Sequence, residues 1–170
     1  MDNNLIFAES QKISESIRSG RALIGSINDK NEPNFMTIGW GMIGNIWYKP
    51  IFITYIRPSR YTFKNINHNP YFTLNIFLNN KHQDILDHCG SISFYDDNKI
   101  KKFNINHQYN ENNIPFHSDA DIVLDCKVIY KQNLDKNEVK QNIKNKYYGN
   151  NDYHTSFYGE ILNYRDQNIS

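Results

Sequence analysis

Residues 51–62 read Ile-Phe-Ile-Thr-Tyr-Ile-Arg-Pro-Ser-Arg-Tyr-Thr. The first six residues are apolar, aromatic or β-branched, which predicts a buried strand. Pro58 has no backbone N–H to donate to a strand ladder, so the strand ends before it. We expect a helix behind this turn with Ser59 as its N-cap, which leaves free backbone N–H groups beside Arg57 and Arg60.

This turn has the chemistry of an anion site. A helix N-terminus attracts anions, and a planar guanidinium binds phosphate oxygens in a bidentate manner. The alternative is a surface turn with two solvated arginines and a structural cap. The local chemistry taken by itself favours this alternative, because helix starts of this kind are common.

The size and charge of the chain limit the function classes. A chain of 170 residues fits one domain, residues 1–170, with a core over about residues 20–164. A net charge of +1 and a spread of basic residues argue against nucleic acid or an anionic membrane as partner. No apolar run is long enough to span a bilayer, and the polar N-terminus does not resemble a signal peptide. Because Cys89 and Cys126 form no pair motif, we expect a cytoplasmic protein.

The pattern along the chain predicts a mainly β fold with short helices (α+β). Strands are expected at 22–27, 35–46, 51–56, 71–78, 121–131 and 155–164. Helices are expected at 9–19, 60–68, 82–89, 96–103 and 136–148, with Gly90 ending the helix at 82–89. Strands follow one another without regular crossover helices, so we expect an antiparallel barrel rather than a doubly wound sheet.

Several kinds of catalytic site have no support in the sequence. The histidines are scattered, at positions 68, 82, 88, 107, 117 and 154, and their spacing predicts no metal site. The chain lacks a nucleophile elbow, a Gly-rich phosphate loop and a dinucleotide-binding fingerprint. A nucleotide-like cofactor would therefore need another architecture.

Four segments in sequence order carry a family resemblance. They are Asn34 to Gly41; Lys49-Pro50 followed by Arg57 to Thr62; Cys89 to Ser93 with Asp97 to Lys99; and His154 to Ile161. Together they resemble the flavin reductase-like, FMN-binding split-barrel family, and its flavoredoxin-like branch in particular. The resemblance covers about residues 20–164, and the first two segments at their mutual spacing are its most specific part.

The resemblance implies a Greek-key split barrel that forms a homodimer and binds one FMN per subunit. It also implies that a hydride passes from NADH or NADPH to the flavin, and that electrons then pass to a small-molecule or protein acceptor. One alternative is a flavoredoxin-like electron carrier that does not itself oxidise NADH or NADPH. Another is a split barrel that has lost its flavin.

The resemblance also implies roles for individual residues. The residues on the phosphate side are Arg57, Ser59, Arg60, Tyr61 and Thr62, and those along the flavin ring are Asn34, Thr37, Ile38, Gly39 and Trp40. Lys99 is implied at the phosphate or the flavin edge, and His154 in nicotinamide binding or proton delivery. The alternatives are a core or interface aromatic for Trp40, a solvated surface lysine for Lys99 and a surface histidine for His154.

One loop departs from the family pattern. After Ser93 the family usually continues with Gly-Arg-Asp, whereas this chain has Phe94-Tyr95-Asp96. The change removes a flexible residue and a cationic group. It leaves open whether the loop alters flavin affinity or the choice of electron donor.

Overall fold

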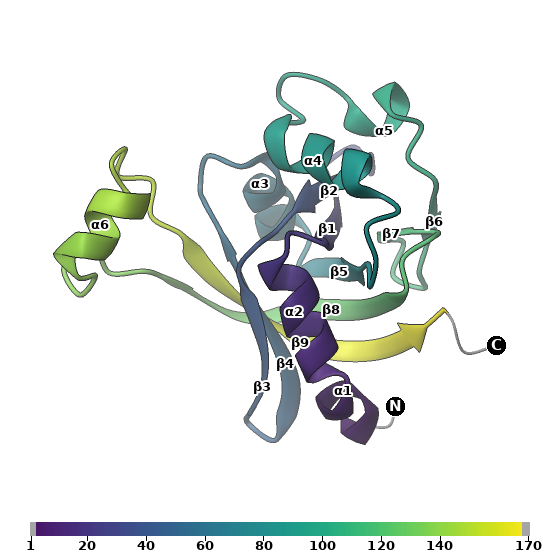
Figure 1. Ribbon diagram of the computed structural model, residues 1–170, viewed down its shortest axis with the longest axis horizontal. Coiled ribbons are helices and arrows are strands. Elements are labelled where there is room, and N and C mark those ends of the chain that lie inside the picture. Colours follow the sequence, from purple (N-terminus) through teal and green to yellow (C-terminus); the bar gives the residue numbers. More distant parts are fainter. Residues whose placement is uncertain (1–2, 168–170) are drawn as a thin grey trace.

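A strongly curved antiparallel sheet forms the body of the molecule in the computed structural model, which describes residues 3–167 (Figure 1). Within these residues, seven strands lie in the order β2-β1-β5-β8-β9-β4-β3, and β6 and β7 form a separate pair. The strands are β1 (Ala22–Ile27), β2 (Pro33–Thr37), β3 (Gly41–Ile46), β4 (Lys49–Ile56), β5 (Tyr71–Ile76), β6 (His107–Tyr109), β7 (Pro115–His117), β8 (Ile122–Asn133) and β9 (Thr155–Asp166). The predicted mainly β split-barrel fold with short helices is confirmed.

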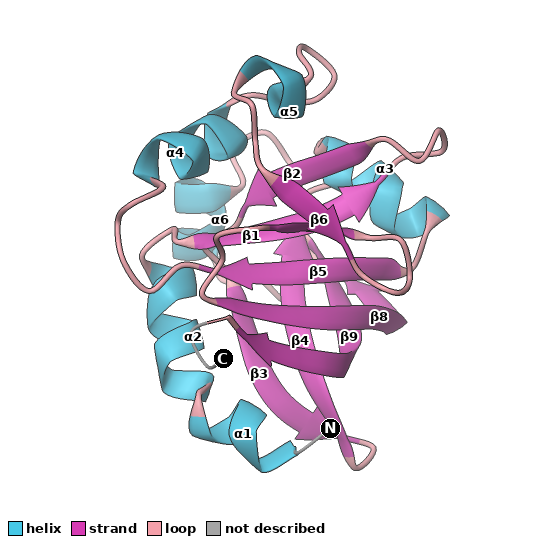
Figure 2. Cartoon of the chain, turned by 90° about the vertical axis from the view of Figure 1, so that its right-hand side faces the viewer, coloured by secondary structure: helices cyan, strands magenta, loops and turns pink. Residues whose placement is uncertain are grey.

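Six short helices are described, of which the first five lie at the ends and on the outside of this sheet and the last lies away from it (Figures 1 and 2). They are α1 (Asn3–Ala8), α2 (Ser10–Arg18), α3 (Tyr61–His68), α4 (Gln83–Ser91), α5 (Lys99–Lys102) and α6 (Gln141–Tyr147). The prediction that Gly90 ends the fourth of these helices is wrong, because α4 continues through Gly90 to Ser91.

A short link determines the curvature of the sheet. Strands β2 and β3 are its two opposite edges, yet only residues 38–40 join them along the chain. Edge strands of a flat seven-stranded sheet would lie about 29 Å apart, from six spacings of about 4.8 Å. The four chain steps from Thr37 to Gly41 span at most about 15 Å. The sheet must therefore curl until its edges approach, although no strand ladder joins β2 to β3 in the described part of the chain.

The same link corrects one sequence prediction. Residues 35–46 were expected as a single extended segment, but the structure divides them into β2 and β3. Gly41 begins β3 where a side chain would press against the ring of Phe52, with a built Cβ only 2.8 Å from that ring. The glycines thus mark the place where the chain crosses from one sheet edge to the other.

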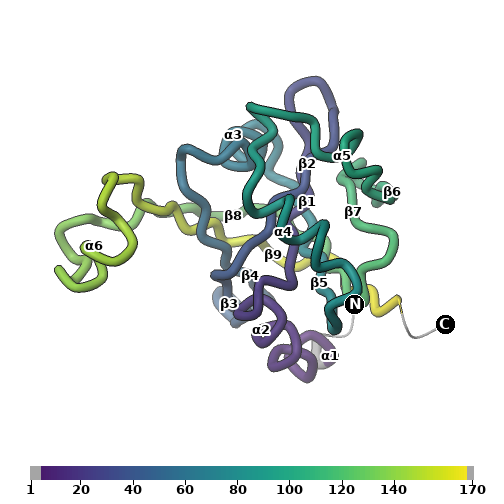
Figure 3. The backbone as a smooth tube through the Cα atoms, turned by 45° about the horizontal axis from the view of Figure 1, so that its top comes forward, coloured from purple at the N-terminus to yellow at the C-terminus, as the bar shows by residue number. Residues whose placement is uncertain are grey.

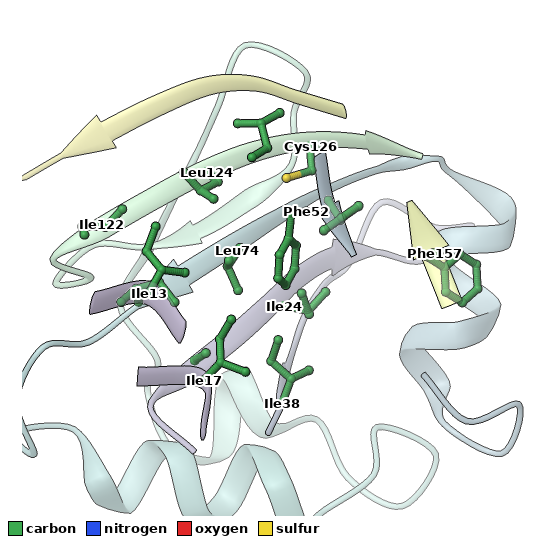
Figure 4. Close-up of a cluster of buried hydrophobic side chains, with 14 of the residues drawn as sticks. Ile13, Ile17, Ile24, Ile38, Phe52, Leu74, Ile122, Leu124, Cys126 and Phe157 are labelled. Atoms are coloured by element: carbon green, nitrogen blue, oxygen red, sulfur yellow. The ribbon is translucent and has the colours of Figure 1, made fainter. Parts of the chain in front are cut away.

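The core fills the inside of the curled sheet (Figure 4). It is lined by apolar side chains of helix α2 and of strands from both halves of the sheet: Ile13, Ile17, Ile24, Phe52, Leu74, Ile122, Leu124, Cys126 and Phe157. Ile38 of the link is also buried in this core, and its N–H donates to the carbonyl of Ala22 at 3.0 Å. Burial of Ile38 fixes the link, while the residues after it remain at the surface.

Strands β8 and β9 extend beyond the body, and the segment that joins them, which contains α6, projects from it (Figure 3). Their pairing runs out to Asn133 opposite Thr155, and none of the residues of α6 is buried. We call residues 134–154 the arm. Among residues 3–167, no helix has both the length and the apolar character needed to cross a bilayer.

The substitution Gly25→Ala tests how closely β7 packs on the sheet. A side chain at Gly25 of β1 would overlap the carbonyl oxygen of Pro115 and the hydroxyl of Thr73. We expect Gly25→Ala to lower the free energy of unfolding by about 3 kcal/mol, because a packed core resists overfilling. Gly44→Ala is the control, since a Cβ there meets nothing within 4 Å. Urea denaturation of both variants measures the effect, and equal stabilities would contradict this packing.

Candidate functional site

A pocket of about 230 Å³ opens where the link passes the turn after β4. Its walls come from the end of β2, the link, the end of β4, the start of α3 and the start of β9. We call it the central pocket. It brings together seven of the residues predicted for the site: Thr37, Ile38, Gly39, Trp40, Arg57, Arg60 and His154.

Among the hollows that adjoin the central pocket, two contain the other residues predicted for the site. A crevice of about 10 Å³ contains the predicted residues Asn34, Tyr61, Thr62 and Lys99, and an open hollow of about 640 Å³ beside the arm contains Ser59. Arg60 lines all three spaces. Every residue predicted for the site therefore lies on one of three hollows that meet at Arg60.

The two arginines of the turn have different environments. Arg57 donates from Nη1 to the carbonyl of Asp152 at 3.0 Å and from Nη2 to the carbonyl of Tyr147 at 2.8 Å. Its guanidinium also lies 5.4 Å from the centre of the Tyr148 ring. Arg57 therefore attaches the arm to the body. Arg60 is exposed, and its guanidinium makes no hydrogen bond or ion pair with any described residue.

The predicted N-cap at Ser59 is wrong. Helix α3 begins at Tyr61, and its N-cap position is held by Arg60 in an extended conformation without a side-chain cap. Instead, the hydroxyl of Ser59 donates to Asp152 Oδ2 at 2.5 Å. A charged acceptor makes a stronger hydrogen bond than a backbone group, so the hydroxyl turns toward the arm.

Polar side chains beside the crevice are largely satisfied within the protein. Asn34 donates from Nδ2 to Thr62 Oγ1 at 3.0 Å, and the hydroxyl of Thr37 donates to the carbonyl of Leu86 at 2.5 Å. Asn34 Oδ1 is the exception, because it is buried and has no partner among the described residues. An unpaired buried acceptor is costly, which makes Asn34 a candidate to receive a hydrogen bond from a ligand.

Lys99 is buried, with 2% of its surface exposed, so the alternative of a solvated lysine is excluded. Its Nζ donates to the carbonyl of Phe35 at 2.6 Å and to that of Cys89 at 3.4 Å. Burial lowers the pKa of Lys99, and the charge of Arg60 acts in the same direction. Burial also raises the pKa of the Cys89 thiol to about 11, so Cys89 is not a reactive thiolate.

His154 lies in the wall of the central pocket and is 8% exposed, which excludes the surface-histidine alternative. Its Nδ1 is 2.9 Å from the Tyr148 hydroxyl, and its ring centre is 4.6 Å from that of Trp40. Burial disfavours the imidazolium and Arg57 adds a positive charge, so the pKa of His154 is lowered to about 4. The imidazole is therefore neutral near pH 7.

Trp40 is not a core residue, because 39% of its surface is exposed. Its ring meets that of Tyr147 edge to face at 5.3 Å, and Tyr147 belongs to the arm. The arm thus supplies Tyr147, Tyr148 and Asp152 to the site. The sequence did not predict these residues, because their contacts with the turn connect positions about ninety apart.

The loop that departs from the family pattern covers the crevice with aromatic rings. Phe94 stacks on Tyr61 with ring centres 4.8 Å apart and an interplanar angle of 22°. Tyr95 meets the same ring edge to face, also at 4.8 Å. An apolar cover therefore stands where the family pattern has a flexible residue and a cation.

Comparisons with known proteins identify the family and the fold of the chain. The sequence model of the flavin reductase like domain family matches residues 14–169. No curated protein gives a significant match. Many solved structures are similar in fold, and three of them are compared with this chain. Flavoredoxin of Desulfovibrio vulgaris (Miyazaki F) has a TM-score of 0.67 and 19% identity, over 85% of this chain and 68% of that chain.

The other two are more distant in sequence. The FMN-binding protein from Thermus thermophilus has a TM-score of 0.66 and 17% identity, over 87% of this chain and 70% of its own. The NADH:FAD oxidoreductase of Streptomyces globisporus C-1027 has a TM-score of 0.64 and 13% identity, over 85% of this chain and 74% of its own. At such identities the likeness shows a shared fold.

Burial of His154 predicts a pH-dependent stability. Because the pKa of His154 is about 4 in the folded protein and near 6.5 when unfolded, the unfolded state binds more protons in this window. Its contribution is fully present above about pH 6.5 and is lost as the pH falls toward 4. We expect His154→Gln to reduce the loss of stability between pH 7 and pH 4.5 by about 2 kcal/mol.

Denaturant unfolding at several pH values measures this difference. His68→Gln, at an exposed position of α3, is the control for removing a histidine. Equal pH dependences of the wild type and His154→Gln would show that burial of His154 is not responsible.

Proposed function

The chain belongs to the flavin reductase like domain family, and from this membership we propose that it is an FMN-binding oxidoreductase. In this proposal NADH or NADPH gives a hydride to the flavin, and electrons then pass to a small-molecule or protein acceptor. The observation that carries the proposal is the unpaired guanidinium of Arg60, which stands at the start of α3 where three hollows meet.

The residues present fit the phosphate end of FMN. A phosphate dianion needs a cation with free donors, and Arg60 has these beside the first backbone N–H groups of an eight-residue helix. In this proposal the side chains of Arg57 and Ser59 do not bind the phosphate directly, because their hydrogen bonds are made to the arm. Arg57 still adds positive charge at close range.

The residues present also fit the flavin ring. Trp40, Ile38 and Met36 supply apolar surface against which a flavin ring could pack in the central pocket. At Gly39 the absent side chain leaves the backbone open, since a built Cβ would meet only the carbonyl oxygen of Ile17 at 4.0 Å. Asn34 Oδ1 is an unpaired acceptor that could receive a hydrogen bond from the polar edge of a ligand.

FMN would supply the redox chemistry when bound, because a flavin can accept a hydride and release electrons singly or in pairs. The chain supplies position and hydrogen bonding. His154 is neutral near pH 7, so its Nε2 can take part in a hydrogen bond in the wall of the central pocket without bringing a charge. Tyr148 fixes the orientation of that ring through Nδ1. Arg57 holds the arm that carries Tyr148.

A homodimer is part of the proposal. Large apolar side chains are exposed over β3, its turn to β4, and the outer parts of β8 and β9: Met42, Ile46, Trp47, Tyr48, Ile129, Tyr130 and Leu162. A second copy would cover such a surface, as in most soluble oligomers. A cytoplasmic location is also proposed, since both described cysteines are free thiols, which persist in reducing compartments.

The second candidate function is a flavoredoxin-like carrier that exchanges electrons with a partner protein. The volume of the central pocket favours it, because about 230 Å³ holds little beyond a flavin ring, and a nicotinamide would have to lie in the more open hollows beside it. The aromatic cover formed by Phe94 and Tyr95 narrows the neighbouring crevice further.

Arg60→Ala tests the phosphate assignment. We expect the dissociation constant for FMN, measured by quenching of flavin fluorescence, to rise about tenfold to a hundredfold. The reason is the loss of charge-assisted hydrogen bonds worth about 2 kcal/mol. Lys64→Ala is the matched control, because this exposed cation of α3 pairs with Asp29. Unchanged affinity in Arg60→Ala would remove Arg60 from the phosphate site.

Anaerobic mixing separates the two functions. If the protein is a reductase, NADH or NADPH bleaches the absorbance of the bound flavin within seconds. If neither nicotinamide bleaches it while dithionite does, the carrier function replaces the reductase. The wild type with bound FMN is sufficient for this experiment, and free FMN is the control.

A further inference from the structure

We propose that His82, His117 and Asp119 form a binding site for a divalent transition-metal ion such as Zn²⁺, outside the three hollows of the flavin site. One ligand atom from each residue lies within 4.8 Å of the others. Imidazole nitrogen and carboxylate oxygen are ligands that zinc accepts, with water completing its coordination. The sequence predicts no such site, because His82 and His117 are 35 positions apart and are brought together only by the fold.

The elements that carry the ligands are well fixed. His117 is the last residue of β7, and its N–H donates to Asn75 Oδ1 of β5 at 2.8 Å. The hydroxyl of Thr73, also in β5, donates to the carbonyl of Pro115 at 2.6 Å. His82 holds the N-cap position of α4, but its side chain makes no capping hydrogen bond. The His82 imidazole therefore remains available to an ion.

The buried nitrogen of His117 points to a ligand. His117 has 0% of its surface exposed, and its Nε2 is buried with no hydrogen-bond partner among the described residues. Buried polar atoms without partners are rare and unfavourable, and each calls for an explanation such as an unseen ion. The ring of His82 lies 5.2 Å away, so the orphan atom is next to a second potential ligand.

The hydrogen bond at His117 Nδ1 determines which ring nitrogen carries the proton before a metal ion binds. The backbone N–H of Asp119 donates to His117 Nδ1 at 3.1 Å, so the neutral ring carries its proton on Nε2. For a metal ion to bind Nε2, the Nε2 proton must leave to solvent and a proton must be taken up at Nδ1, so the ring changes tautomer and stays neutral with no net release of a proton. A protonated Nδ1 can no longer accept the hydrogen bond from the Asp119 N–H, so this N–H must turn away from the ring. Asp119 is an exposed residue in a turn, which permits the movement. We therefore expect affinity in the micromolar range, below that of preformed structural sites.

A hollow of about 310 Å³ gives an ion access to two of the three ligands, and the buried His117 is not part of its lining. It is lined by His82 and Asp119 together with Asn79, Lys81 and Asp121. The Asp119 carboxylate in this lining is a negative charge beside the two imidazoles, which favours a cation. In a tetrahedral zinc site, bonds of about 2.0–2.1 Å hold the ligand atoms about 3.4 Å apart, so the three ligand atoms, now within 4.8 Å of one another, must move closer. Small shifts of the partly exposed His82 and of the exposed Asp119 can provide this closure.

A metal here would join the start of α4 to the segment between β7 and β8. The same helix contacts the flavin-side residues, since the carbonyl of Leu86 accepts from Thr37 and that of Cys89 from Lys99. Metal binding would therefore stabilise a wall of the flavin site without taking part in its chemistry. This inference does not rest on flavin binding.

Calorimetric titration with ZnCl₂ after chelator treatment and desalting tests the site. We expect one zinc ion per chain for the wild type, and a dissociation constant at least about tenfold weaker for His82→Gln and for Asp119→Asn. Both substitutions are at partly or fully exposed positions and spare the fold. His68→Gln is the matched control and should bind zinc as the wild type does.

Two outcomes of the same titration would contradict the proposed metal site. Absence of saturable zinc binding in the wild type would overturn the proposal, and so would equal affinities in all four proteins. The titration does not require flavin, so it is carried out on FMN-free protein and then repeated on FMN-loaded protein. Failure of the metal site is thus distinguishable from failure of the proposed function.

Discussion

The three-residue link between the two edge strands is the constraint on which the rest of the structure depends. Because residues 38–40 must join β2 to β3, the seven-stranded sheet has to curl until its edges approach each other. Ile38 anchors the link in the core, and the glycine and tryptophan after it stay at the surface. The segment that connects the two sheet edges therefore also forms a wall of the central pocket.

A second feature, the arm, completes the site from the other side. Strands β8 and β9 carry it out of the body, and Arg57 ties it back through the carbonyls of Tyr147 and Asp152. This separates the roles of two arginines that look equivalent in the sequence. Arg57 has its hydrogen bonds to the arm, whereas Arg60 is left unpaired and available to an anion. The burial of His154 follows from the same attachment, because its partner Tyr148 lies in the arm.

Local patterns predicted much of the fold. The strand at Ala22–Ile27 was predicted at its observed bounds, and the helix at 60–68 begins one residue later than expected. The two short strands β6 and β7 were missed, because three residues are too few to show a period. The single strand expected at 35–46 was wrong, since a local pattern cannot show that the chain changes sheet edges.

For the site, as for the fold, the sequence predicted what local motifs determine but not what contacts between distant segments determine. All of the expected residues line three adjoining hollows, since the family motifs carry their relative order. Their environments were not predictable. The cap at Ser59 was wrong because Asp152, 93 residues away, accepts its hydroxyl. The burial of Lys99 and the approach of His82 to His117 likewise depend on contacts between distant segments.

The absorbance spectrum of the purified protein, after incubation with FMN and desalting, tests the central claim most directly. The account predicts that the flavin bands remain, at one FMN for each chain, because the unpaired cation and the pocket beside it are built to retain that ligand. A colourless protein after this treatment would contradict the claim that these hollows form a flavin site.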